Sequence, residues 1–412
     1  MRGLVGILAL LSIAYVFCEN RRGINWRVVI GGVLLQAGLA ILLLKVPAAI
    51  QALALLNKGV VSLQTAADAG SAMVFGFLGG GPLPYAETTP GGSFTLAFRV
   101  FPLFLVVSAL ASLLLYWGVL QKIVGGLAFL LRWTLGIGGA LGLGAAIHIF
   151  VGMIEAPLLI RPYLKTMSRG ELFALMSCGM AGIAGTVMVI YATILSAVLA
   201  DSFGSVLAAA VLSTPAALAV AAIMVPFAVD RGESATLDEG ERPGSFMEAI
   251  VQGTNDGIGM LAAVIAMLIV LVSLVTLINM ALGLVTLEGA PVTLQRLFAF
   301  GFRPLVWIIG IPWTEAGTAA NLMGTKTVLN EFAAFLDLAH LAPDALSPRS
   351  RLIMTFALCG FANFGSLGIM LGGMSAMAPG RRHEIVSLGP RAMISGTLAT
   401  LMSGAIVSVL TP

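Results

Sequence analysis

Eight long apolar runs constrain the fold of this chain more than any other feature. They cover residues 4–17, 28–44, 101–120, 172–199, 206–229, 260–284, 353–371 and 393–410. Most are close to the ~20 residues that an α-helix needs to cross ~30 Å of hydrocarbon. Inside a bilayer such a run must pair its backbone N–H and C=O groups within itself, which only a helix achieves. We therefore predict an all-α polytopic membrane protein with about eight transmembrane helices.

Composition supports this prediction and excludes several other classes. The 412 residues are 59% hydrophobic and only 10% charged, whereas roughly 25% of a soluble domain is charged. A net charge of +3, spread along the chain, indicates no nucleic-acid partner. The cysteines (Cys18, Cys178 and Cys359) lie in or beside apolar runs and predict neither a disulfide framework nor a zinc site. The sequence shows no catalytic grouping, metal cluster or phosphate-binding loop, so we predict a protein without a cofactor that is not an enzyme.

Two regions do not fit simple membrane spans. Residues 135–162 contain "HIFVGMIEAPLLIRP", in which Glu155 interrupts an apolar stretch. Residues 305–338 contain "PWTEAGTAANLMGTKTVLNEFAAFLDL", which is interrupted by Glu331 among other polar residues. Half-length apolar segments that break on a polar residue predict re-entrant helical hairpins, because non-helical backbone at membrane depth persists only where it is packed in protein or lines a cavity.

An internal repeat connects these two regions. The octets "CGMAGIAG" at 178–185 and "CGFANFGS" at 359–366 align without a gap, offset by 359 − 178 = 181 residues. Each octet follows an acid-bearing hairpin and precedes one further apolar run. An odd number of crossings separates the copies, so the second copy is predicted to be inverted. Paired interruptions of this kind indicate a transporter binding site near the bilayer midplane.

The repeat divides the chain into four predicted parts. Residues 1–132 form scaffold helices with an interfacial helix over 48–78, and residues 133–229 form the first repeat. Residues 230–300 form a cytoplasmic loop and a long scaffold helix, and residues 301–412 form the second, inverted repeat. With an external N-terminus, more than half of the 22 basic residues fall in cytoplasmic segments, as the positive-inside rule requires.

Polar residues within the hairpins and octets are the candidate substrate-binding groups. A carboxylate near the bilayer centre costs roughly 3 kcal/mol, so Glu155 and Glu331 are functional candidates, although either could instead pair with a nearby arginine. Asn363 and Ser366 offer an amide and a hydroxyl that suit a neutral polyhydroxylated ligand. Ser366 could equally bond within its own helix, and Phe361 could stack on a ring or serve only in packing.

His148 is the candidate proton carrier. It precedes the break between Gly152 and Pro157, and its unperturbed pKa near 6.5 suits reversible protonation. The alternative is a structural histidine held by a hydrogen bond.

At these motifs the sequence resembles the concentrative nucleoside transporters. "FVGMIEAPLLIRPYL" is similar to the first hairpin tip of that family, "IPWTEAGTAANLMGTKTVLNEFAAF" to its second hairpin, and "CGFANFGSLGIMLGG" to its broken seventh helix. The resemblance implies a homotrimer of eight-span subunits in which a mobile transport domain moves against a scaffold in elevator fashion. It also implies that Glu155, Glu331, Asn363 and Ser366 hold the nucleoside, chiefly its ribose, and that Phe361 lines the same cleft.

The sequence departs from the family pattern at the nucleobase and sodium positions. The first tip in the family reads glycine, glutamine, a hydroxyl residue and glutamate, but here Met153 and Ile154 replace the two polar base contacts. At the ion site the resemblance implies an asparagine where His148 stands and a serine where Gly182 stands. The remaining ligands are backbone carbonyls, which Val151 and Ile183 still supply. Loss of two oxygen side chains weakens a site for a hard cation, so H⁺ is favoured over Na⁺ as the coupling ion.

The sequence thus predicts a symporter that imports nucleosides or related ribosides across the bacterial cytoplasmic (inner) membrane. Two alternatives remain open: an elevator transporter of another small polar metabolite, and a membrane enzyme that uses the same cavity.

Overall fold

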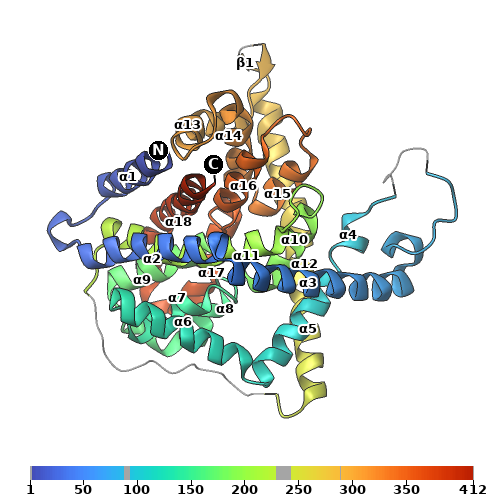
Figure 1. Cartoon of the computed structure of the whole chain (residues 1–412), viewed down its shortest axis with the longest axis horizontal. Helices are drawn as coiled ribbons and strands as arrows, with labels where there is room; N and C mark the ends of the chain where they lie inside the picture. Colours follow the sequence, from blue (N-terminus) through green and yellow to red (C-terminus); the bar gives the residue numbers. More distant parts are fainter. Residues whose placement is uncertain (1, 88–92, 229–242, 288, 412) are drawn as a thin grey trace.

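The computed structural model describes residues 2–87, 93–228, 243–287 and 289–411. The chain is built from helices, with one small hairpin in which β1 (Thr286–Leu287) pairs antiparallel with β2 (Ala290–Pro291) (Figure 1). Most of the predicted cytoplasmic loop at the start of residues 230–300 lies outside the described residues.

Six stretches of the described residues are long and apolar enough to cross a membrane. They are Trp26–Lys45, Leu96–Tyr116, Arg169–Leu195, Ser202–Met224, Phe246–Leu282 and Pro379–Leu410. Each overlaps one of the eight predicted spans. The predicted span at 4–17 is α1 (Arg2–Val16), which is 15 residues long, and the one at 353–371 is divided between α16 (Pro348–Leu358) and α17 (Phe364–Met377). The chain is therefore a helical membrane protein in which several of the expected spans are short or interrupted, including 172–199, which breaks between Ala181 and Gly185.

The N-terminal third is a series of helices with defined local start signals. After α1 come η1 (Arg21–Gly23), α2 (Trp26–Lys45), α3 (Pro47–Phe75), η2 (Gly76–Gly79), α4 (Leu96–Arg99), α5 (Leu103–Tyr116) and α6 (Val119–Leu135). The Asn25 side chain caps α2 by accepting a hydrogen bond from the Arg27 N–H at 3.2 Å. Pro47 occupies the first turn of α3, where its missing N–H is tolerated. This helix lies where the interfacial helix over 48–78 was predicted.

The two halves that follow contain the same order of elements. The first half has short helices α7 (Gly139–Ile147) and α8 (Glu155–Leu159), then η3 (Arg161–Lys165), the broken pair α9 (Arg169–Ala181) and α10 (Gly185–Leu195), and α11 (Ser202–Met224). The second half has α14 (Trp313–Val328), α15 (Glu331–His340), the broken pair α16 and α17, then η4 (Pro379–Arg381) and α18 (Arg382–Leu410). Helix α13 (Leu294–Ile308) precedes this second half as α6 precedes the first. A pair of short helices, an interrupted helix and a long helix therefore occur twice.

The core is centred on α11, which packs against α2, α9 and α18. Residues of α11 are buried almost throughout. Gly32 of α2 allows a close approach, because a Cβ there would lie 2.8 Å from the Pro215 carbonyl oxygen of α11. The buried Gln36 side chain of α2 donates to the Ser403 hydroxyl of α18 at 3.0 Å. Helices α1 and α2, predicted to belong to a scaffold, thus contact helices of both predicted repeats.

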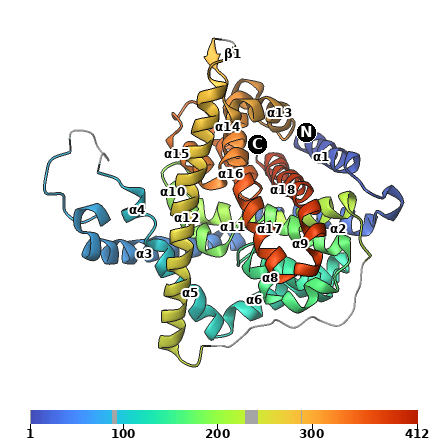
Figure 2. The ribbon, with the colours of Figure 1, turned by 180° about the vertical axis from the view of Figure 1, so that it is seen from behind.

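The long helix α12 (Phe246–Leu282) lies at the edge of the molecule. It packs chiefly along α5, as Figure 2 shows, and only 6% of its most apolar 18-residue window is buried within the chain. Gly253 and Gly257 of α12 lie against α5, where a Cβ would come within 3.1 Å of α5 atoms. The rest of this apolar helix faces outward, which in a membrane protein means lipid or another subunit.

Candidate functional site

The two glycine-rich octets meet where their helices break. The Phe361 N–H donates a hydrogen bond to the Gly182 carbonyl at 3.1 Å, joining the break after α9 to the break after α16. A Cβ on Gly360 would lie 2.6 Å from the Ala181 carbonyl oxygen, so this approach requires glycine. Backbone groups freed by one interruption are therefore partly satisfied by the other.

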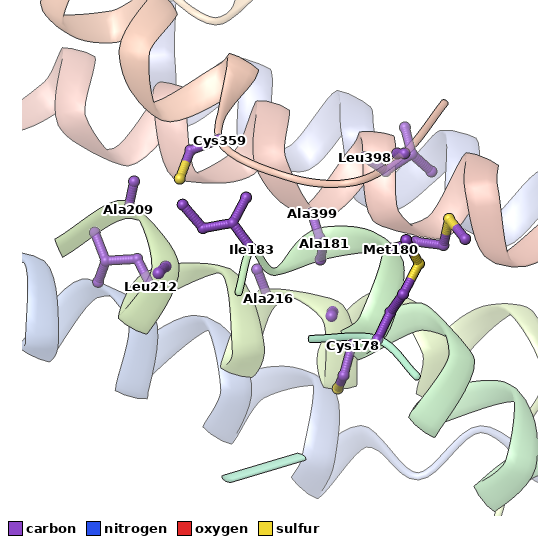
Figure 3. Packing of buried hydrophobic residues seen from close by; sticks show 14 of the residues in the cluster. Cys178, Met180, Ala181, Ile183, Ala209, Leu212, Ala216, Cys359, Leu398 and Ala399 are labelled. Carbon is purple, nitrogen blue, oxygen red and sulfur yellow. The ribbon is translucent and has the colours of Figure 1, made fainter. Parts of the chain in front are cut away.

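Both breaks rest on α11. Figure 3 shows Ile183 and Cys359, one from each break, close to Ala209 and Leu212 of α11. The Cys359 thiol lies 3.7 Å from the Val206 carbonyl oxygen of the same helix. Helix α11 therefore packs against both helix breaks where they meet.

Glu331 is the centre of a buried polar network beside this crossing. It begins α15 and is only 5% exposed. Its carboxylate accepts hydrogen bonds from the Tyr191 hydroxyl at 2.6 Å and from Nδ2 of Asn363 at 2.9 Å. Tyr191 comes from the first half of the molecule and Asn363 from the second. The α15 N-terminus further favours negative charge at this position.

Asn363 connects the network to the start of α17. It is fully buried, and its Oδ1 accepts a hydrogen bond from the Ser366 N–H at 2.7 Å, which caps the helix. Both ends of its amide are thus engaged, one with the helix and one with Glu331. No hydrogen bond joins the Ser366 hydroxyl to another group of the described residues.

Lys326 is a buried cation beside the same network. It is 0% exposed, and its ammonium donates to the Ala357 carbonyl at 2.9 Å and to the Thr400 hydroxyl at 3.1 Å. Ala357 lies in the last turn of α16, where carbonyls lack helical partners and a positive charge is favourable. The ammonium and the Glu331 carboxylate also attract each other electrostatically.

Sequence reasoning did not identify Tyr191 or Lys326 as members of this group. Both interrupt apolar segments, "VIYATIL" and "MGTKTVL", and each is a polar group that a buried environment obliges to find a partner. A polar side chain inside an apolar segment was therefore the sequence signal that could have identified both residues.

Glu155 lies in a different environment. It begins α8, is half-buried, and forms no hydrogen bond with another described residue through its carboxylate. The carboxylate turns back over Gly152, where a Cβ would lie 2.3 Å from Oε2. Gly152 therefore makes room for this orientation of the acid.

The two apolar residues of the first tip pack on both halves of the molecule. Met153 lies against α9, since its Cβ would be 3.3 Å from a Cβ on Gly179. Ile154 lies against α17, where its Cδ1 would be 2.2 Å from a Cβ on Gly373. Gly373 is ten residues after Asn363, or ~15 Å along the helix. The first tip therefore contacts α17 near its C-terminal end, whereas Asn363 lies at the N-terminal end of the same helix.

The predicted ion-coupling residues lie on two facing segments. A Cβ on Gly182 would be 3.4 Å from the His148 carbonyl oxygen, and the Gly185 N–H donates to the Phe150 carbonyl at 2.9 Å. Val151 and Ile183 therefore come from neighbouring stretches of backbone. The His148 ring is buried at 3% exposure against Gly179, and its Nε2 has no hydrogen-bond partner among the described residues.

Comparisons with known proteins identify the family to which these features belong. A family model for the N-terminus of Na⁺ dependent nucleoside transporters matches residues 5–78, a nucleoside-recognition gate model matches 97–198, and a model for the C-terminus of Na⁺ dependent nucleoside transporters matches 205–408. The nucleoside permease NupC of Helicobacter pylori is 34% identical, over 98% of this chain and 96% of its own. The chain belongs to the concentrative nucleoside transporter family.

Other family relatives cover the chain equally completely. An uncharacterized transporter of Haemophilus influenzae is 37% identical, over 99% of this chain and 97% of its own. The solved structure of CNTnw in an inward-facing substrate-bound state is 36% identical and superimposes with a TM-score of 0.90, over 100% of this chain and 97% of that one. The predicted resemblance is confirmed, and so is the prediction that the chain is a transporter and not an enzyme, because the family consists of nucleoside transporters.

Proposed function

We propose that this protein is a symporter that imports nucleosides or related ribosides across the bacterial cytoplasmic (inner) membrane, with H⁺ favoured over Na⁺ as the coupling ion. The observation that supports this most directly is the Glu331–Tyr191–Asn363 network, which joins both halves of the chain beside the crossing of the helix breaks. A site built from both repeats is carried as one unit when the two repeats move together against the remaining helices.

The sugar would bind at the Glu331 end of the site. A carboxylate has about four acceptor positions, and two protein donors occupy only part of the Glu331 capacity. Ribose hydroxyls can donate to the remaining positions, and the Ser366 hydroxyl lies one turn into α17 to complete the polar group.

The base would bind at the first tip. Met153 and Ile154 offer apolar surface there, and the Glu155 carboxylate adds acceptor positions. Phe361, half-buried beside Gly182, would line the same cleft. Apolar contacts discriminate weakly between bases, so we propose broader base selectivity than in members that carry polar contacts.

The movement that we propose is of the elevator type, with α7–α8 and α14–α15 as re-entrant hairpins among eight spans. We assign residues 133–229 and 301–412 to the moving part. Residues 1–132 and 230–300 would form the stationary part, and within them α5 packs along α12 as one unit. Helices α1 and α2 of the same part contact the repeats and would form the surface along which the repeats move. The outward apolar face of α12 suits the subunit contacts of a homotrimer.

The coupling ion follows from the chemistry of the segments at His148 and Gly182. A hard cation prefers oxygen ligands, and here an imidazole and a glycine leave only backbone carbonyls. A buried polar atom normally has a partner, so the unpaired Nε2 of His148 supports a place where a proton or a water is taken up during transport.

Transport in proteoliposomes tests this proposal. Uptake of labelled uridine and adenosine is measured while Na⁺ and pH gradients are imposed separately. We expect accumulation driven by an inward H⁺ gradient. Uptake that requires Na⁺ and ignores the pH gradient would refute the assignment of the ion, and no gradient-dependent uptake of either nucleoside would refute the assignment of the substrate.

The His148→Asn plus Gly182→Ser double variant restores both oxygen side chains implied by the family pattern. A gain of Na⁺ dependence would locate the ion site at these residues. If no Na⁺ dependence appears, the ion site differs in more than these two side chains.

A further inference from the structure

An apolar groove lies between α2 and α6, on the outside of the molecule. It has a volume of about 610 Å³ and is lined on α2 by Gly31, Leu34, Gly38 and Leu42, among others, and on α6 by residues that include Trp133. A Cβ on Gly38 would meet no atom within 4 Å, so the absence of a side chain there keeps the groove open. Its shape is a trough along one helix.

A positive charge lies on the same face of α2, one turn before the groove begins. Residues 31, 34, 38 and 42 follow the three- and four-residue spacing that places side chains on one face of a helix. Arg27 continues that face one turn earlier and is exposed. From Gly31 to Leu42, the part of α2 that lines the groove, the helix rises ~16 Å, which is about half of the ~30 Å hydrocarbon thickness, or one leaflet.

The same end of the trough carries residues typical of a membrane–water interface. The C-terminus of α6 reaches α2 here, since a Cβ on Gly31 would lie 3.7 Å from the Thr134 carbonyl oxygen. Trp133 is 73% exposed and Trp26 is 55% exposed. Exposed tryptophans beside an arginine mark the headgroup level. The groove therefore extends from the headgroup level into the hydrocarbon region of the bilayer.

We propose that this groove is a binding site for an anionic phospholipid, with one acyl chain in the trough and the phosphate paired with Arg27. The trough is one leaflet long and apolar, which fits an acyl chain, and the arginine at its interfacial end fits an anionic headgroup. Arg27 also belongs to the segments predicted to face the cytoplasm, where anionic lipids are attracted to basic residues beside the membrane.

Quenching of Trp133 fluorescence by lipids with brominated acyl chains tests this site in the full-length protein. The protein is reconstituted in phosphatidylcholine vesicles, and brominated phosphatidylglycerol or brominated phosphatidylcholine is titrated in. The signal of the Trp133→Phe variant is subtracted to isolate Trp133. We expect half-maximal quenching at about fivefold less phosphatidylglycerol than phosphatidylcholine, the preference that one basic residue near the surface provides.

Two variants separate the parts of the site. Arg27→Gln should reduce the preference for phosphatidylglycerol to about one. Gly38→Leu should fill the trough and weaken quenching by both lipids, whereas Gly259→Leu on α12, where a Cβ also meets no atom within 4 Å, should leave it unchanged. Equal quenching of the wild type by the two lipids, or an unchanged titration in Gly38→Leu, would overturn the proposal.

Discussion

The two hairpin glutamates occupy corresponding places in the two halves of the chain, yet their surroundings differ. Glu331 is 5% exposed and is held by donors from α10 and α17, with the buried Lys326 ammonium nearby. Glu155 is half-buried, its carboxylate lies over Gly152 in its own tip, and no other described residue forms a hydrogen bond with it. One acid is part of a fixed network, and the other is oriented chiefly by its own loop.

This difference indicates that the two acids contribute to binding in different ways. A carboxylate already bonded to the protein is preorganised, so a ligand that meets it loses little of its binding energy to ordering the site. A carboxylate without a protein partner gains its hydrogen bonds only when a ligand or water arrives. Substitutions at Glu331 should therefore disturb both the structure and transport, whereas substitutions at Glu155 should disturb transport alone.

Glu331→Gln should have the largest effect on uptake. The amide turns its NH₂ group toward either Tyr191 or Asn363, and it weakens two bonds to a charged group at ~1.5 kcal/mol or more each, so uptake should fall about 100-fold. The thermal unfolding midpoint should fall as well. The matched control is Asp256→Asn, an exposed acid on α12, which should change neither. Normal uptake by Glu331→Gln would remove this residue from the site.

Glu155→Gln should also lose most uptake, roughly 30-fold, since one charged hydrogen bond to a ligand contributes ~2 kcal/mol. Its unfolding midpoint should match the wild type, because no other described residue bonds to this carboxylate. A destabilisation as large as that of Glu331→Gln would show that the two acids are held alike and would break the comparison.

Much of this site could be predicted from the sequence, because intramembrane acids are rare and costly. Glu331 and Asn363, 32 residues apart, were both named as ligand-binding groups and form a hydrogen bond with each other. The octet repeat also predicted two interrupted helices, and both breaks are present. These features are local interruptions of an apolar pattern, which a single sequence displays directly.

The sequence did not predict which helices pack against each other or which side chains form hydrogen bonds between them. Tyr191 lies 140 residues before Glu331, and nothing in its apolar run shows which residue its hydroxyl contacts. The packing of α1 against α18 and of α2 against α11 likewise depends on shape and on small residues such as Gly32, not on hydropathy. Hydropathy locates a helix in the membrane but leaves its neighbours open.

Lys326→Met, which changes the surroundings of Glu331, should reduce uptake less than either glutamate substitution. Methionine keeps the length of the side chain but leaves the Ala357 carbonyl and the Thr400 hydroxyl without this donor, which should cost ~2 kcal/mol of stability. Uptake should fall about tenfold, as the end of α16 and the charge balance near Glu331 both change. Lys58→Met, at an exposed position of α3, is the control. Wild-type stability in Lys326→Met would show that other groups satisfy this carbonyl.

Tyr191→Phe should have the smallest effect and gives the finest test of the network. It removes only the hydroxyl that donates to Glu331 at 2.6 Å and leaves the bond from Asn363 intact. A preorganised acid that keeps one of its two donors should still bind the sugar, so KM for uridine should rise about fivefold, equivalent to ~1 kcal/mol, with little change in maximal rate. Tyr116→Phe, at the exposed end of α5, should leave both constants unchanged. A fall in maximal rate with an unchanged KM would instead show that Tyr191 acts in the movement and not in binding, because its hydroxyl holds α10 and α15 together within the moving part.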